Sequence, residues 1–376
     1  MALVKMGWVG LLAVLLLAGC GQTAVLPPPP PATLASETAV SPLPSRTPTS
    51  PTVVTDRETA VSPSASPTYP PATLSPTPLP SATPSATPDP YAGLSIQALA
   101  ARSYGGGLLQ IEQTLETTET FTRYLISYPS DGLTIFGYMN VPHNGEAFPV
   151  VIMLHGYVPP EEYQTVAYTR RYADDLARAG YFVIHPNLRN YPPSDSGPDP
   201  FRIGYATDVL NLLAIVREQS QDPTGVLRRA DSDNIHLWGH SMGGGIALRV
   251  AVVNNAAYVK TAVLYASMSG DESLNYAQIQ QWSGGSRGAF ELAAPPETLA
   301  LISPINHLDR LNAAISIHHS DADERVPVAW SEALCARLAA LEHPTDCFIY
   351  NGQPHTFRGS GDDLFMERVR SFYGRH

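Results

Sequence analysis

Positive charge, cysteine and long apolar runs are all scarce in this sequence of 376 residues. Lys and Arg number 23 against 34 Asp and Glu, a net charge of -11, which argues against a nucleic-acid partner and against charge-driven binding to anionic lipid. The apolar run Trp8–Ala18 is shorter than the roughly 20 residues of a transmembrane helix. With three cysteines, the chain can close one intramolecular disulfide at most.

The first 20 residues have the features of an export signal. Lys5 provides a short positive region, and Trp8–Ala18 an apolar core of the usual length. The tetrapeptide Leu17-Ala18-Gly19-Cys20 resembles the bacterial lipobox, in which the cysteine is lipidated and becomes the new N-terminus. The resemblance implies a signal peptide over residues 1–19, a lipid on Cys20 and a membrane-anchored lipoprotein on the extracytoplasmic side. The alternative is a plain secretory signal with an incidental cysteine.

Proline is abundant but unevenly placed. More than half of the 36 prolines lie between Pro27 and Pro90, in a segment otherwise rich in Ser, Thr and Ala. Such a chain buries too little apolar surface to offset the entropy lost on ordering. We therefore expect residues 20–90 to be a disordered tether, and residues 91–376 to form the folded domain.

The folded part shows a strand–helix alternation typical of a doubly wound sheet. Short apolar runs such as Pro149–Leu154 indicate buried parallel strands. An initial hairpin followed by strand–helix units predicts an α/β fold with a mostly parallel sheet of about eight strands. The predicted strands are 121–128, 133–141, 149–154, 181–185, 234–238, 261–265, 313–318 and 347–350; the predicted helices are 161–179, 201–219, 242–253, 328–341 and 362–373.

Two stretches depart from this alternation. Residues 91–118 are interpreted as a short helical lead-in, broken by three consecutive glycines. Residues 270–305 contain Trp282, a Ser-Gly-Gly-Ser stretch and two adjacent prolines. They follow the sixth predicted strand, and we interpret them as a small cap or pocket wall inserted into the domain.

The strongest chemical signal is the heptapeptide Trp238-Gly239-His240-Ser241-Met242-Gly243-Gly244. It contains Gly-x-Ser-x-Gly between a predicted strand and a predicted helix, the context of a nucleophile elbow. The serine of an elbow occupies a tight, strained turn, so the residues two before and two after it must be small. The alternative is a glycine-rich turn for phosphate. The pattern favours Ser241 as a nucleophile.

A nucleophilic serine needs a base and an acid, which follow in the order acid, then histidine, in this type of site. Among the histidines that follow the acid candidates, His355 lies in the loop after the last predicted strand, at the sheet edge where such sites form. Three acids compete, namely Asp321, Asp323 and Glu324. Spacing alone does not choose among them.

The segment from His319 to Pro327 resembles the H-G-x-x-D-x-x-V-P block of the prolyl oligopeptidase and dienelactone hydrolase branches of the α/β-hydrolases. Ser320 stands where glycine is usual. Further matching blocks are Leu154-His155-Gly156-Tyr157, the elbow, and Pro354-His355-Thr356-Phe357, so the resemblance covers roughly residues 120–376. It implies an α/β-hydrolase fold with Asp323 as the acid, and a catalytic domain without the β-propeller of the large peptidases.

The resemblance also implies the chemistry. A Ser241–His355–Asp323 triad would hydrolyse an ester or a short peptide in two acyl-transfer steps. The Met242 amide and Tyr157, through its hydroxyl and a neighbouring amide, would stabilise the oxyanion. The alternatives are a carboxylesterase or lipase only, or a non-catalytic binding module. His155 and His240 are interpreted as packing or hydrogen-bonding residues, and no cofactor or metal is expected.

Two cysteines remain once Cys20 is assigned to the lipid. Cys335 lies on a predicted helix, and Cys347 begins the strand that follows it. In an oxidising compartment the two can form a disulfide. The alternative is a pair of buried free thiols.

Overall fold

The computed structural model describes residues 89–254 and 256–376. The predicted signal peptide, Cys20 and nearly all of the predicted tether lie outside these residues. The described part of the chain belongs to one compact unit.

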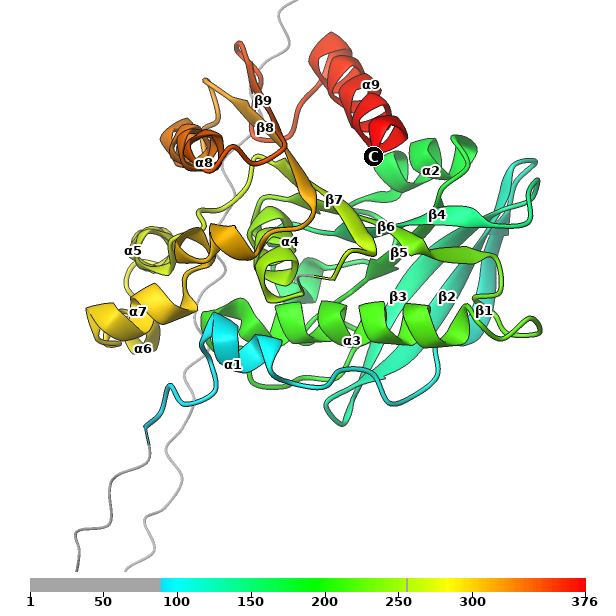
Figure 1. Cartoon of the computed structure of the whole chain (residues 1–376), viewed down its shortest axis with the longest axis horizontal. Helices are drawn as coiled ribbons and strands as arrows, with labels where there is room; N and C mark the ends of the chain where they lie inside the picture. The colour runs from blue at the N-terminus through cyan, green and yellow to red at the C-terminus, as the bar shows by residue number, and fades with distance from the viewer. Residues whose placement is uncertain (1–88, 255) are drawn as a thin grey trace, which may run out of the picture. The chain divides into compact units, whose positions relative to one another are not determined.

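A single twisted sheet forms the centre of the described domain (Figure 1). The strand order is β1-β2-β3-β5-β4-β6-β7-β8-β9. Strands β1, β2, β3 and β5 pair antiparallel in turn, and all pairs from β5 to β9 are parallel. The strands are β1 Gln110–Thr117, β2 Phe121–Ser130, β3 Leu133–Pro142, β4 Phe148–Leu154, β5 Phe182–Pro186, β6 Ala230–His240, β7 Val259–Tyr265, β8 Ala314–Ser320 and β9 Thr345–Tyr350.

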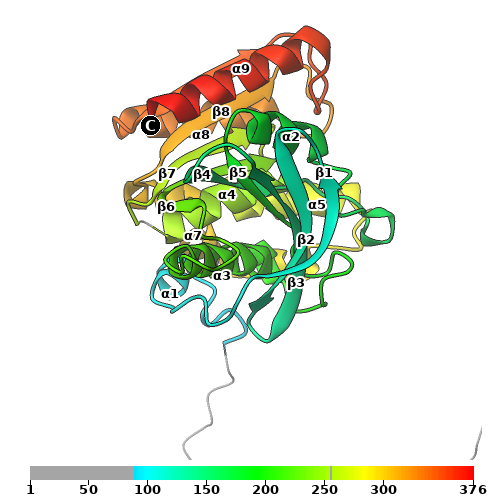
Figure 2. The same cartoon turned by 90° about the vertical axis from the view of Figure 1, so that its right-hand side faces the viewer.

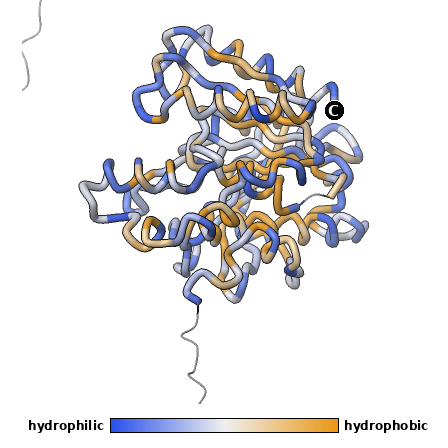
Figure 3. The backbone as a smooth tube through the Cα atoms, turned by 60° about the vertical axis from the view of Figure 1, so that its left-hand side comes forward, coloured by the Kyte–Doolittle hydropathy of each residue, from blue (hydrophilic) through white to orange (hydrophobic). Residues whose placement is uncertain are grey.

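Helices cover both faces of the sheet, as Figure 2 shows from a second side. One face packs against α3 (Ile203–Gln219), α4 (Met242–Val253) and α8 (Val328–Ala340), and α1 (Ile96–Ala100) packs onto α4. The other packs against α2 (Arg170–Arg178) and α9 (Gly359–Arg375). Hydrophobic segments concentrate in the interior, and hydrophilic turns lie at the periphery (Figure 3). The predicted mostly parallel, doubly wound sheet is therefore confirmed.

The insertion between β7 and β8 is helical. It comprises α5 (Glu272–Trp282), α6 (Ala289–Leu292), α7 (Pro296–Ile302) and the 3-10 turns Pro304–Asn306 and Leu308–Arg310. Buried Glu272, at the start of α5, forms ion pairs with Arg202 before α3 and with Arg249 on α4. One end of the insertion is thus fastened to the domain by a buried charge cluster.

The predicted helical lead-in is correct only in its first part. Residues Ile96–Ala100 are helical, but Gln110–Thr117 form the edge strand β1. Almost all of β1 is exposed, so its sequence shows no buried face, and pairing with β2 decides its conformation. The sheet therefore has nine strands where eight were expected, and the insertion follows the seventh strand.

The predicted helix over residues 161–179 is too long. Only Pro160–Glu162, as a 3-10 turn, and Arg170–Arg178 are helical. Between them, the Tyr163 hydroxyl contacts His185 Nε2 at 3.0 Å, and the Tyr168 hydroxyl contacts His240 Nδ1 at 2.6 Å. These buried contacts hold the connection against the sheet edge in a non-helical path.

Candidate active site

Ser241 lies on a strained turn between β6 and α4. Its backbone has φ 57° and ψ -117°, outside the regions that a serine ordinarily adopts. A Cβ on Gly239 would lie 2.2 Å from the Gly243 carbonyl oxygen, and one on Gly243 would lie 2.2 Å from that of Leu154. The two glycines are thus required by close backbone approach. The turn is held by a hydrogen bond from the Ser241 amide to the Tyr265 carbonyl at 2.8 Å.

The structure brings Asp323 and His355 together. Asp323 follows β8 and His355 follows β9, and Asp323 Oδ2 is 2.8 Å from His355 Nδ1. Asp323 Oδ1 accepts hydrogen bonds from the amides of Arg325 and Val326 at 2.8 and 2.9 Å. Burial raises the pKa of Asp323, but hydrogen bonds from His319, His355 and the Val326 amide outweigh it and hold this pKa well below its usual value. The carboxylate therefore stays charged beside the imidazole.

The two competing acids have other partners. Asp321 Oδ1 accepts a hydrogen bond from the Gly352 amide at 2.8 Å, and Glu324 Oε2 accepts one from the His355 amide at 3.0 Å. Both carboxylates hold the backbone of the loop that follows β9. They shape the path of this loop, while Asp323 contacts the His355 ring.

Ser241 and His355 line one cavity of about 1310 Å³ beneath the insertion. The core contributes Met242 and Met268 to its wall, and the insertion contributes Tyr276, Ile279 and Trp282. Charged side chains of both signs also line it, namely Glu162, Asp199, Arg202, Arg287, Glu291, Glu324, Arg325 and Arg358.

The wall of the cavity next to Ser241 is built from α4 and the loop after β4. Met242 is the first residue of α4, where a backbone N–H has no acceptor within the helix and the helix dipole favours negative charge. A Cβ on Gly156 would lie 3.1 Å from the Ser241 Cβ, so this loop runs directly against Ser241. Tyr157 lines the cavity with 47% of its surface exposed. Its hydroxyl accepts a hydrogen bond from Arg287 Nη1 at 2.9 Å, a contact with the insertion that the sequence did not indicate.

His155 and His240 are buried and hydrogen-bonded, as expected. His155 lies 2.7 and 2.8 Å from the carbonyl oxygens of Gly156 and Asn187. His240 Nε2 lies 3.1 Å from the His355 carbonyl oxygen, and its ring lies 4.7 Å from the His355 ring. Burial, followed by the nearby His355, lowers the pKa of His240 to about 3, so its ring stays neutral. Tyr168, which is hydrogen-bonded to His240, also lines the cavity. No local sequence motif indicated this residue.

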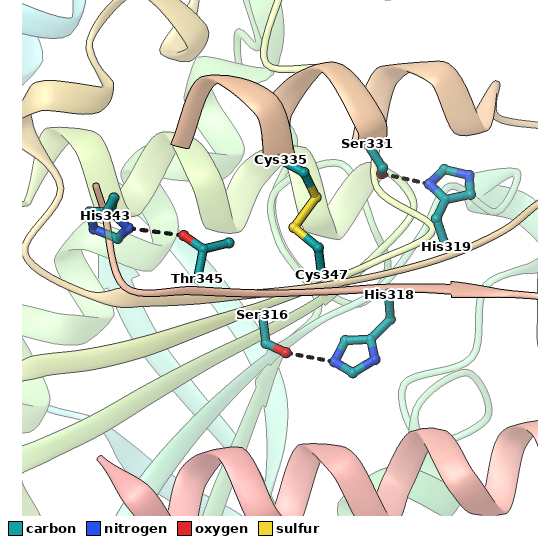
Figure 4. Close-up of a disulfide and its surroundings, with 8 residues drawn as sticks. All are labelled: Ser316, His318, His319, Ser331, Cys335, His343, Thr345 and Cys347. Atoms are coloured by element: carbon teal, nitrogen blue, oxygen red, sulfur yellow. Dashed lines mark hydrogen bonds between the residues drawn. A yellow bond between two sulfur atoms is a disulfide. The ribbon is translucent and has the colours of Figure 1, made fainter. Parts of the chain in front are cut away.

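Cys335 and Cys347 are bonded, with an S–S distance of 2.08 Å (Figure 4). The bond joins α8 to β9. Among the described residues, no group of three or more His, Cys, Asp and Glu side chains could hold a metal ion. No helix in residues 89–254 and 256–376 has the length and hydropathy needed to cross a membrane.

Comparisons with known proteins agree with this architecture. Residues 149–303 match the family described as alpha/beta hydrolase fold. A puromycin-hydrolyzing peptidase of Mycobacterium tuberculosis has 19% identity and a TM-score of 0.53, with 69% of this chain and 40% of the peptidase covered. An acylaminoacyl peptidase of Pyrococcus horikoshii has 21% identity and a TM-score of 0.53, with coverages of 69% and 42%.

An acetyl xylan esterase of a Thermoanaerobacterium species is similar over more of its length. It has 16% identity and a TM-score of 0.52, with 70% of this chain and 87% of the esterase covered. The present chain thus spans less than half of each of the two peptidases and most of the esterase. All three share its fold.

Proposed function

We propose that this protein, which has the α/β-hydrolase fold, is a serine hydrolase that cleaves esters or short peptides by two-step acyl transfer. One observation carries the proposal. A strained serine at the end of β6 and a histidine bonded to a buried carboxylate line the same cavity. This arrangement is what nucleophilic catalysis by serine requires.

Each residue has a definite role in the proposed mechanism. His355 takes the proton of Ser241 as its Oγ attacks the acyl carbon, and Asp323 stabilises the imidazolium that forms. Amides at the start of α4 and near Tyr157 stabilise the negative oxygen of the tetrahedral intermediate. His355 then protonates the leaving group, and water activated by the same histidine releases the acid from Ser241.

The similar proteins support acyl chemistry without choosing between its two forms. Two of them are named as peptidases and one as an acetyl xylan esterase, and all of these names describe cleavage of an acyl–oxygen or acyl–nitrogen bond. The large cavity accommodates more than a small acyl group. A panel of p-nitrophenyl esters and aminoacyl nitroanilides would decide between ester and amide substrates.

Labelling with a fluorophosphonate probe tests whether the site is a catalyst or only a binding module, because the probe reacts with an activated serine. We expect the wild-type protein to be labelled, and Ser241→Ala to lose both labelling and ester hydrolysis while remaining folded. Ser220→Ala is the matched control, since Ser220 contacts Ser232 at the opposite end of β6, with 2.7 Å between the two Oγ atoms. More than about a hundredth of wild-type activity in Ser241→Ala would show that another group is the nucleophile.

The proposal extends to the location of the enzyme. The lipobox-like sequence ending at Cys20 supports attachment to a membrane through an N-terminal lipid, and a disulfide supports an oxidising compartment. Cys20→Ser should release the enzyme into the soluble fraction or leave its signal uncleaved. A processed Cys20→Ser protein that still sediments with membranes would contradict the anchor.

A further inference from the structure

His318 and His319 are adjacent, fully buried histidines on β8 with different surroundings (Figure 4). Successive side chains of a strand point to opposite faces of the sheet. His318 points toward α9 and contacts Ser316 Oγ and the Tyr350 hydroxyl at 2.8 and 2.9 Å. His319 points toward α8, the side on which Asp323 lies.

The contacts of His319 determine which of its nitrogens carries the ring hydrogen. Nε2 lies 3.1 Å from the Val326 carbonyl oxygen and 3.1 Å from Asp323 Oδ2. Both neighbours are acceptors, so Nε2 must donate. In the neutral ring Nδ1 then accepts, and its partner at 2.7 Å is the Ser331 hydroxyl on α8. Ser331 thereby orients the ring with its donor toward Asp323.

Asp323 is consequently held from both ends of its carboxylate. Two backbone amides bind Oδ1, while the rings of His319 and His355 both approach Oδ2. The side chain of Asp323 is 1% exposed, so no bulk solvent replaces a missing donor. Without His319, the oxygen that contacts His355 would lose its other side-chain donor, so the position of Oδ2 would be less tightly fixed than that of Oδ1.

We propose that His319 is a positioning residue of the active site, which holds Oδ2 of Asp323 in the place where it can orient His355. The inference rests on the proposed function, because the ring that Asp323 orients is the proposed base. His319 itself touches neither substrate nor Ser241 in this scheme. It acts through Asp323, and Ser331 acts through His319.

Three variants distinguish a role of His319 in positioning Asp323 from a role in the stability of the fold. His319→Leu removes the donor, and His319→Gln keeps an N–H group near the position of Nε2. His318→Leu is the matched control, because it removes two hydrogen bonds from an equally buried histidine on the other face of the same strand. Each is measured for kcat and KM on p-nitrophenyl acetate, for the rate of fluorophosphonate labelling and for thermal unfolding.

We expect His319→Leu to lower kcat and the labelling rate by about 10- to 100-fold, by analogy with the loss of the hydrogen-bond partners that orient metal ligands. KM should stay within about threefold of wild type, and His319→Gln should recover most of the rate. His318→Leu should unfold at a lower temperature but turn over substrate at nearly the wild-type rate. Equal losses of kcat in His318→Leu and His319→Leu, or a failure of His319→Gln to recover activity, would overturn the positioning role.

A second measurement needs no substrate and keeps this proposal separable from the proposed function. The Nδ1 proton of His355, bonded to Asp323, should give a far-downfield proton NMR resonance in the wild-type protein, in His318→Leu and in His319→Gln. It should be lost or broadened in His319→Leu. Persistence of an unchanged resonance in His319→Leu overturns the positioning role, whereas a wild-type protein that the fluorophosphonate does not label overturns the proposed function.

Discussion

The two sides of the cavity are built in different ways. On the core side, Asp323 and His355 have side chains that are 1% and 8% exposed, and each is held by several hydrogen bonds. On the insertion side, Trp282 is 50% exposed. The turn between α5 and α6 contains Gly284, Gly285 and Gly288, all three at positive φ.

This difference suggests a division of labour. Chemistry needs groups held within a fraction of an ångström, which packed strand ends can provide. Recognition of varied substrates tolerates, and often uses, looser loops on a rigid scaffold. We therefore expect substitutions on the core side to act on kcat, and substitutions in the insertion to act mainly on KM.

The largest effect should come from Asp323. Asp323→Asn keeps the shape of the side chain but removes the charge that stabilises the imidazolium, and we expect kcat to fall by roughly 10⁴-fold. Asp321→Asn is the matched control, since an asparagine still offers an oxygen to the Gly352 amide. Its kcat should stay within a few-fold of wild type. The reverse order of effects would show that the wrong acid has been assigned.

Tyr157 lies at the boundary between the two sides, so it tests the comparison most directly. If its hydroxyl donates to the oxyanion, Tyr157→Phe should lower kcat by about 10²- to 10³-fold, and this is the result we expect. Arg287→Ala leaves the hydroxyl in place and removes its contact with the insertion. It should change KM more than kcat. A kcat of Tyr157→Phe within about threefold of wild type, on an ester and an amide, would leave only backbone amides in the oxyanion hole.

A smaller effect concerns three buried histidines of the core, which make the free energy of unfolding depend on pH. Burial lowers the pKa values of His236, His240 and His318 to about 3, whereas an unfolded histidine takes up a proton near pH 6.5. Below about pH 6.5 the unfolded state therefore binds more protons than the folded one, and the free energy of unfolding should fall as the pH is lowered toward 3. Each such histidine contributes at most roughly 1.4 kcal/mol per pH unit.

Urea unfolding between pH 7 and pH 4 measures this slope. His236→Gln removes one of these three histidines, and His236 does not line the cavity. This variant should reduce the change in the free energy of unfolding per pH unit by the contribution of one histidine. A free energy of unfolding that does not change between pH 7 and pH 5 would contradict the assignment of neutral buried histidines.

Several elements could be predicted because their patterns are local. Helix α4 was predicted with both of its ends correct, since the glycines of the elbow and the apolar run after it define the turn and the helix together. The parallel strands β4, β7 and β8 were located within one or two residues at each end, because continuous apolar runs indicate strands buried on both faces. The strained turn at Ser241 was predicted by the same logic.

Other features depend on partners far along the chain. Strand β1 carries almost no buried residue, and only its pairing with β2 gives it a conformation. The connection before α2 leaves the helical path because Tyr163 and Tyr168 bond buried histidines on β5 and β6. Neither hydrophobic periodicity nor the positions of turn residues predict contacts between side chains that lie far apart in the sequence.

By itself, the sequence determined the class of the sheet, the strained turn at Ser241 and the histidine loop after the last strand, because each depends on residues that are neighbours along the chain. From spacing alone it left three acids in competition, and it gave no role to His319 or Arg287. Only the tertiary structure decided which acid lies beside the His355 ring: it places His355, Asp323, His319 and Ser331 within hydrogen-bonding distance of one another in that order, and it brings Arg287 to Tyr157. Hydrogen bonds between side chains on different elements require the positions of both elements, and those positions exist only once the sheet has formed.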